Sequence, residues 1–159
     1  AIYDTVANTF TFTATMAGTV GTTATSSYVW GVNRGAGTAD FAANGLPNVL
    51  FDRVVRLVPG GTSQIAGGGL PAINLAPGDV TISGSTITAT ISANLLPSTG
   101  FAFTQYTVNL WPRTTAPSGF AGISDFAPDN TNFGVTVVPA PAALSALAAV
   151  SVFGLRRRR

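Results

Sequence analysis

The densest group of residues that could do chemistry lies between Asp125 and Asn132, in the segment Asp-Phe-Ala-Pro-Asp-Asn-Thr-Asn. The side chains of Asp125, Asp129, Asn130 and Asn132 present carboxylate and amide oxygens, which are the hard ligands that Ca²⁺ prefers. The segment lacks the spacing of an EF-hand and a terminal Glu, and Asp or Asn beside Pro also forms turns with its own backbone. We keep both interpretations, favour the turn, and expect no cofactor other than this calcium.

Acid–base and nucleophilic catalysis have few candidate groups in this sequence. Cys, His, Lys and Glu are absent, which excludes disulfides, zinc fingers, and nucleophiles that depend on Cys, His or Lys. Neither a Gly-x-Ser-x-Gly elbow nor an Asp-Thr-Gly element occurs. A carboxylate pair drawn from Asp40, Asp52, Asp125 and Asp129 could still serve a small hydrolase. We predict that the protein is not an enzyme and keep the hydrolase as a minor alternative.

Two further sets of side chains could form a binding surface. Rows of threonine could form a flat ladder for ice or carbohydrate, although Thr is also an ordinary solvent-facing strand residue. Four aromatic residues could stack on sugars, although in a β-sandwich they more often fill the core. The threonines are Thr9, Thr11, Thr13, Thr15, Thr86, Thr88 and Thr90, and the aromatic residues are Tyr28, Trp30, Tyr106 and Trp111.

The charges of the chain are distributed unevenly. Four of the eight basic residues are Arg156–Arg159, so residues 1–155 have four arginines against six aspartates and a net charge of −2. Nucleic-acid binding requires a basic surface that neutralises phosphates, and four scattered arginines do not supply one. We therefore exclude nucleic acid as a partner.

The hydrophobic pattern before residue 139 predicts short strands rather than helices. Residues 8–16 alternate between apolar and Thr side chains, and residues 79–92 read as a hairpin with Val80, Ile82, Ile87, Ala89 and Ile91 facing inward. A three-residue bend at 83–85 accounts for the change of parity between its two strands. Further strands are expected at 26–33, 49–58, 102–111, where Pro112 ends the strand, and 133–138, and a flexible loop at 59–71.

Seven or eight short strands, Gly- and Pro-rich turns and no amphipathic helix before residue 140 predict one all-β domain. We expect an antiparallel β-sandwich over residues 1–138, with a jelly roll or an up-and-down barrel as alternatives. At 159 residues the chain is long enough for one buried core. It begins at Ala1 without Met, which leaves open both the removal of a secretory signal and a trimmed start.

The composition changes at Pro139. Residues 142–155 form a run of fourteen uncharged residues, rich in Ala and Leu, that favours a helix about 21 Å long at roughly 1.5 Å per residue. Such a helix spans a hydrocarbon core of about 30 Å only with help from flanking residues. The arginines after it are expected to stay in the cytoplasm and leave residues 1–138 outside the inner membrane. The alternative is an ordinary C-terminal core helix with a basic end.

The order of these parts closely resembles the PEP-CTERM sorting signal of Gram-negative bacteria. The motif is Val138, Pro139, Ala140 and Pro141, followed by the apolar helix and by the cluster Arg156, Arg157, Arg158 and Arg159. Ala140 stands where that family usually has Glu, so the subtype of the processing enzyme and the cleavage point are open. The resemblance covers residues 138–159 and implies recognition by exosortase, a membrane protease-transpeptidase, and an exported protein associated with exopolysaccharide and biofilm.

We therefore expect a non-catalytic exported protein of the cell surface or the extracellular matrix. Its expected partners are exosortase during sorting, the inner membrane through residues 142–155, and exopolysaccharide. One alternative is a subunit of an extracellular filament or other homo-oligomer, since free edge strands can add strands from neighbouring copies. Another alternative is a module that binds glycan or calcium.

Overall fold

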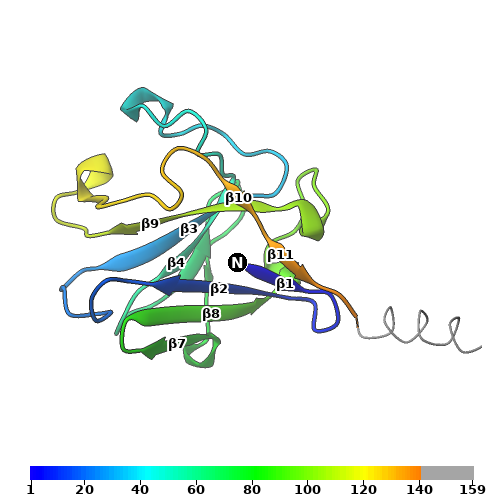
Figure 1. The fold of residues 1–159 in the computed structure, drawn as a ribbon, viewed down its shortest axis with the longest axis horizontal. Helices are drawn as coiled ribbons and strands as arrows, with labels where there is room; N and C mark the ends of the chain where they lie inside the picture. Colours follow the sequence, from blue (N-terminus) through cyan, green and yellow to red (C-terminus); the bar gives the residue numbers. More distant parts are fainter. Residues whose placement is uncertain (141–159) are drawn as a thin grey trace, which may run out of the picture.

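The computed structural model describes residues 1–140 of the chain, and these residues are built mainly from β-strands (Figure 1). Within this range the helical segments are five 3-10 turns, of which the longest has four residues. The strands are β1 (Ile2–Asp4), β2 (Thr9–Thr15), β3 (Ser27–Asn33), β4 (Arg53–Leu57), β5 (Gln64–Ala66), β6 (Ile73–Asn74), β7 (Val80–Ser83), β8 (Thr86–Ser92), β9 (Thr107–Arg113), β10 (Phe133–Gly134) and β11 (Thr136–Val138). The prediction of an all-β body without a long helix is confirmed for residues 1–140.

The strands form two sheets. One sheet has five strands in the order β11-β1-β2-β8-β7, and the other has six in the order β10-β9-β3-β4-β5-β6. Neighbouring strands run antiparallel except β1 and β11, which are parallel. The expectation of antiparallel sheets is therefore confirmed, except that β1 and β11 form a parallel pair. The number of strands is higher than the seven or eight expected from the sequence.

One hydrophobic core lies between the two sheets and contains side chains from both. Phe12 of β2 meets Trp30 of β3 with ring centroids 5.7 Å apart, and Phe10 stacks on Tyr106 at 5.4 Å. Phe10, Phe12 and Tyr106 are fully buried. Burying a large side chain of this kind stabilises the fold by roughly 1.5–3 kcal/mol, so these contacts account for much of the attraction between the sheets.

The predicted alternation of β2 and of the 79–92 hairpin is confirmed. On β8, Ile87, Ala89 and Ile91 are almost completely buried. Ile82 lies opposite Ile87, as the pattern predicts, but it is 45% exposed because β7 is the edge strand of its sheet. The expected three-residue bend is wrong: Ser83 pairs with Thr86. The two-residue loop between them accounts for the change of parity, because an even number of loop residues places odd positions opposite even ones.

The prediction that Pro112 ends its strand is also wrong. β9 continues to Arg113, and Pro112 lies opposite Tyr28 of β3. The carbonyl of Pro112 accepts a hydrogen bond from the amide of Ser124, on the side of β9 that faces away from β3. In an antiparallel strand the N and C=O of one residue point to the same side, so the missing N–H removes no bond to β3.

Three short strands were not expected from the sequence. β1 precedes the first predicted strand, β6 has two residues, and β5 lies within the segment 59–71 that was expected to be a flexible loop. Ile65 of β5 is fully buried in the core. The predicted strand at 133–138 is divided between the two sheets, with β10 in one sheet, β11 in the other and buried Val135 between them.

A second apolar cluster covers the outer face of the six-stranded sheet. Its centre is Trp111 of β9, whose ring lies 5.2 Å from Phe41 and 5.0 Å from Phe51. Trp111 crosses β3 at Gly31, where an added Cβ would lie 2.5 Å from two atoms of the indole ring. All seven residues of β3 are consequently buried, since the core covers one face of the strand and this cluster covers the other.

Candidate functional site

The described part of the predicted sorting motif lies at the edge of the five-stranded sheet. β11 ends at Val138, whose carbonyl accepts hydrogen bonds from the amide of Thr5 at 3.2 Å and from its hydroxyl at 3.1 Å. Val138 is 42% exposed, and Pro139 and Ala140 after it are exposed. Pro141, the apolar segment 142–155 and the cluster Arg156–Arg159 lie outside the described residues. Residues 1–140 contain no helix that is long and apolar enough to cross a membrane.

The segment that could bind calcium is hydrogen-bonded to the loop before β4 through its asparagines. Asn132 accepts a hydrogen bond from the amide of Leu50 through Oδ1 and donates one to the carbonyl of Leu50 through Nδ2, at 3.1 and 2.6 Å. Asn130 Oδ1 accepts one from the amide of Asn48 at 3.2 Å. The structure therefore uses two of the four predicted ligands to connect loops.

The carboxylates of this segment do not form an acidic metal cluster within residues 1–140. Asp125 Oδ1 accepts a hydrogen bond from the amide of the next residue, Phe126, at 2.8 Å. No group of three or more His, Cys, Asp or Glu side chains in the described residues is placed to hold a metal ion. Calcium binding by Asp125, Asp129, Asn130 and Asn132 stays a prediction that rests on their oxygen chemistry.

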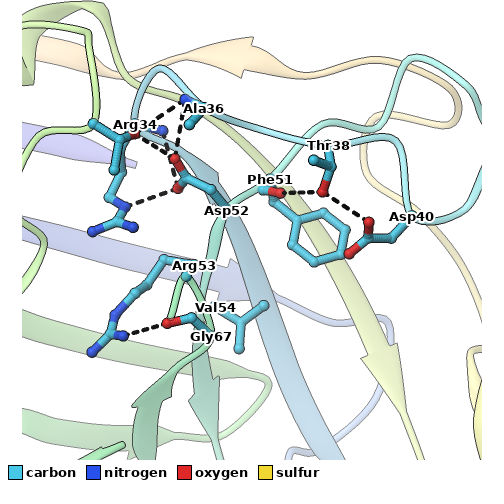
Figure 2. Close-up of a pocket in the computed structure, with 11 residues that line it drawn as sticks. Arg34, Ala36, Thr38, Asp40, Phe51, Asp52, Arg53, Val54 and Gly67 are labelled. Carbon is cyan, nitrogen blue, oxygen red and sulfur yellow. Dashed lines mark hydrogen bonds and ion pairs between the residues drawn. The ribbon is translucent and has the colours of Figure 1, made fainter. Parts of the chain in front are cut away.

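The aspartates that could have served a hydrolase lie in different places. Asp40 and Asp52 line one cavity of about 380 Å³, whereas Asp125 lines another. Asp40 Oδ1 accepts a hydrogen bond from the hydroxyl of Thr38 at 2.8 Å. The fold therefore brings two of the four predicted carboxylates to one cavity (Figure 2).

Asp52 in this cavity is bound by several donors. It pairs with Arg34, whose Nε lies 2.8 Å from Oδ1, and it accepts a hydrogen bond from the Ala36 amide at 3.2 Å (Figure 2). The Thr99 hydroxyl and the Arg34 amide donate two more hydrogen bonds to it, at 2.5 and 3.3 Å. Burial alone would raise the pKa of Asp52, but the hydrogen bonds from Thr99 and Arg34 and the charge of Arg34 outweigh it and lower the pKa. An ionised carboxylate held by these donors stays deprotonated at neutral pH and is poorly suited to take up a proton as a general base.

Arg34 and Arg53 are the two buried cations beside Asp52, and no pattern in the sequence indicated their burial. Each is at most 1% exposed. Arg53 donates to the carbonyls of Gly67, Leu70 and Pro71 and so holds the glycine-rich loop after β5. Burial and the neighbouring charge of Arg34 lower the pKa of Arg53. Such arginines stabilise loops through backbone carbonyls.

Close packing of this loop also requires a glycine. An added Cβ at Gly68 would lie 2.5 Å from the carbonyl oxygen of Asp52 and 2.6 Å from Nη2 of Arg34. The φ angle of Gly68 is +65°, in the left-handed region that favours glycine. The glycine run at 67–69, which lacks the Lys of a phosphate-binding loop, therefore has a packing role.

The threonine rows come together as the sequence predicts. Across β2 and β8, three pairs of threonine hydroxyls lie 3.1–3.3 Å apart, and their side chains face solvent. The pairs are Thr11 with Thr90, Thr13 with Thr88, and Thr15 with Thr86. Each hydroxyl is partly satisfied by its partner across the strands, which is the ordinary stabilising pair of an exposed sheet face.

The other two arginines of residues 1–140 were also missed as site residues. Arg56 and Arg113 are half-buried and line one cavity with Trp111 on the outer face of the six-stranded sheet. The available signal was the spacing of two between Trp111 and Arg113, because residues two apart in a strand share a face.

Comparison of the chain with protein families, with curated proteins and with solved structures gave no significant match. The residues and the geometry described above are therefore the basis for assigning a function.

Proposed function

We propose that this chain is a non-catalytic exported protein of the cell surface or the extracellular matrix. In this proposal residues 1–138 are a β-sandwich body and residues 139–159 are a C-terminal sorting signal. A sandwich is favoured over a closed barrel because the two sheets are separate and each has two edge strands in the described residues. The observation that best supports the sorting role is the position of Pro139 and Ala140, exposed directly after the last edge strand.

Sorting of this kind requires a motif that a membrane enzyme can reach while the body is already folded. Val138 is held by Thr5, and only Pro139 and Ala140 separate it from Pro141. A cut on the C-terminal side of the motif would leave the pairing of β11 with β1 intact. The body would then retain its fold after the apolar segment and the arginines are removed.

The expected route follows from the charges of the tail. Residues 142–155 would enter the inner membrane, the four arginines would stay on its cytoplasmic side, and exosortase would act on the motif at the opposite surface. The cell envelope or the extracellular matrix of a Gram-negative bacterium is the proposed destination. The exposed, uncharged threonine face of the body suits a structural role in a polysaccharide-rich matrix.

A second candidate function is that of a filament subunit. β7 and β11 are the edge strands of the five-stranded sheet, and Ile82 on β7 is 45% exposed. An edge with unpaired backbone groups and an exposed apolar side chain can add a strand from another copy. Electron microscopy of the purified protein distinguishes the two candidates, since filaments favour assembly and dispersed particles favour a sorted monomeric body.

The sorting proposal is tested by replacing all four residues of the Arg156–Arg159 cluster by Gln in the host that makes the protein. The variant should accumulate in a different cell fraction, because the segment loses the charges that fix its orientation. Thr13→Glu on the exposed face of β2 is the control, since it also makes the protein more negative and leaves the tail unchanged. An unchanged destination of the tail variant would contradict the proposal.

A further inference from the structure

An aromatic cavity with two cations lies on the outer face of the six-stranded sheet. It has a volume of about 400 Å³, within the range of small-molecule sites. Val29 of β3 and Val54 of β4 contribute apolar side chains to it, and Phe51 and Trp111 contribute aromatic rings. The cavity can therefore accommodate a ligand with a flat apolar face.

The cations are placed by the register of the sheet. Arg56 of β4 and Trp111 of β9 both lie opposite Val29 of the central strand, so the three residues form one row. Strands in a sheet are spaced by about 4.7–4.9 Å, which puts the backbones at Arg56 and Trp111 about 10 Å apart. Arg113 follows Trp111 by two residues and projects from the same face of β9. A ring-shaped ligand would lie over the outer face of β3, between side chains of β4 and β9.

The two guanidinium groups lack an acidic partner in the described residues. All six aspartates lie within residues 1–140, and the one ion pair found there joins Arg34 to Asp52. Arg113 uses Nη2 to donate to the carbonyl of Gly119 at 3.2 Å, which leaves its other donors available. Two half-buried cations beside apolar walls attract an anion whose remaining surface is apolar, and a guanidinium matches a carboxylate with two parallel hydrogen bonds.

We propose that the cavity between Arg56, Arg113 and Trp111 binds a carboxylate-bearing sugar ring, such as a uronate residue of an acidic polysaccharide. The carboxylate would meet the two guanidinium groups, and the C–H face of the ring would lie against the aromatic and aliphatic walls. The hydroxyl of Thr115, which also lines the cavity, supplies a polar group for a sugar hydroxyl. The choice of a sugar over another carboxylate rests on the proposed function, since a matrix protein meets acidic polysaccharide.

The two tryptophans supply a direct assay with an internal reference. Trp111 lines the cavity, whereas Trp30 is 3% exposed in the core between the sheets and has no atom in the cavity lining. In ¹⁵N-labelled full chain, titration with sodium glucuronate should shift the indole N–H signal of Trp111 saturably and leave that of Trp30 in place. Replacing each Trp by Phe assigns the two signals.

Three protein variants and two further compounds make the result decisive. Arg56→Gln and Arg113→Gln should each weaken glucuronate binding about tenfold, because each removes a charge-assisted hydrogen bond. Thr13→Glu, on the opposite exposed sheet, changes the net charge by the same amount and should leave the affinity within about twofold. Glucose should not compete, and benzoate should bind more weakly than glucuronate.

The proposal is overturned if glucuronate leaves the Trp111 signal unmoved at millimolar concentrations, or if both arginine variants bind as the unmodified chain does. Benzoate binding more tightly than glucuronate would also overturn it, because the preferred ligand would then be an aromatic carboxylate. These outcomes are separate from the failure of the sorting proposal, which depends on the tail and on cell fractionation.

Discussion

Gly31 and Trp111 supply a sharp test of how the second apolar cluster is packed. Gly31 is paired on both sides, with Val54 of β4 and Asn109 of β9, so its backbone has little room to move. Its added Cβ would lie 2.5 Å from Cη2 and Cζ3 of Trp111 and 3.1 Å from Cβ of Phe51. The Gly31→Ala protein must therefore displace the indole by about an ångström to restore a normal contact.

The expected cost follows from the surroundings of the indole. Trp111 is 3% exposed, and the rings of Phe41, Phe51 and Phe126 lie 5.2, 5.0 and 5.9 Å from it, so an indole pushed away from Gly31 disturbs this packed aromatic cluster. Inserting a methyl group into a packed site costs about 1–3 kcal/mol. For a domain of this size, we expect Gly31→Ala to lower the Tm by roughly 5–10 °C.

Thermal and urea unfolding of four variants beside the unmodified protein tests this packing. Gly134→Ala is the matched control, since a Cβ there meets nothing within 4 Å, and it should leave the Tm nearly unchanged. Trp111→Leu should itself destabilise the fold, but adding Gly31→Ala to it should cost little, because the ring that the methyl group strikes is gone. The reasoning is refuted if Gly31→Ala melts with the unmodified protein, or if its cost is the same in both backgrounds.

Three further predictions concern charge, burial and calcium. Because the pKa of Asp52 is lowered in the folded protein, its contribution to stability is present above about pH 4 and is lost as the pH falls through the folded pKa. Asp52→Asn should weaken this acid dependence, and it should cost about 3 kcal/mol at neutral pH because it leaves Arg34 without its ion-pair partner. Urea titrations at several pH values measure both effects. Burial raises the pKa of Tyr106 to about 12. The contribution of Tyr106 to stability is therefore fully present below about pH 10 and declines as the pH rises toward the folded pKa of about 12. Tyr106→Phe should remove that alkaline decline and cost about 1 kcal/mol through the lost bond to the Leu96 carbonyl, and unchanged alkaline unfolding curves would dismiss this role. If the 125–132 segment binds calcium, millimolar Ca²⁺ should raise the Tm above its value in excess chelator, whereas equal values would exclude the site.

The strands that could be predicted are those with one face in the core and one in solvent. β2 and β8 read correctly because Phe, Ile and Ala alternate with Thr over seven residues. β5 and β6 have three and two residues, too few to show a period, and they form because β5 pairs with β4 and β6 pairs with β5. The prediction that Pro112 ends its strand is wrong because the sequence does not show which side of a strand faces a neighbouring strand.

The cavities could not be predicted, because they depend on register and on contacts between distant residues. Arg34 and Asp52 are eighteen residues apart, and the pairing of β3 with β4 brings them together. The Thr11–Thr90 pair likewise depends on register, but the alternation on both strands was enough to predict an exposed ladder. Arg56 and Arg113 line one cavity because Arg56 lies opposite Val29 of β3, as Trp111 does, and Arg113 lies two residues from Trp111 on the same face of β9.

The central claim is that a folded β body is delivered by a C-terminal segment that is then removed. Intact-mass measurement of the protein purified from the envelope or the matrix of its own host tests this claim most directly. The mature protein should have a mass without the apolar segment and the terminal arginines, with the chain ending at or near the Val138–Pro141 motif. A mature protein whose mass still includes Arg159 would contradict it.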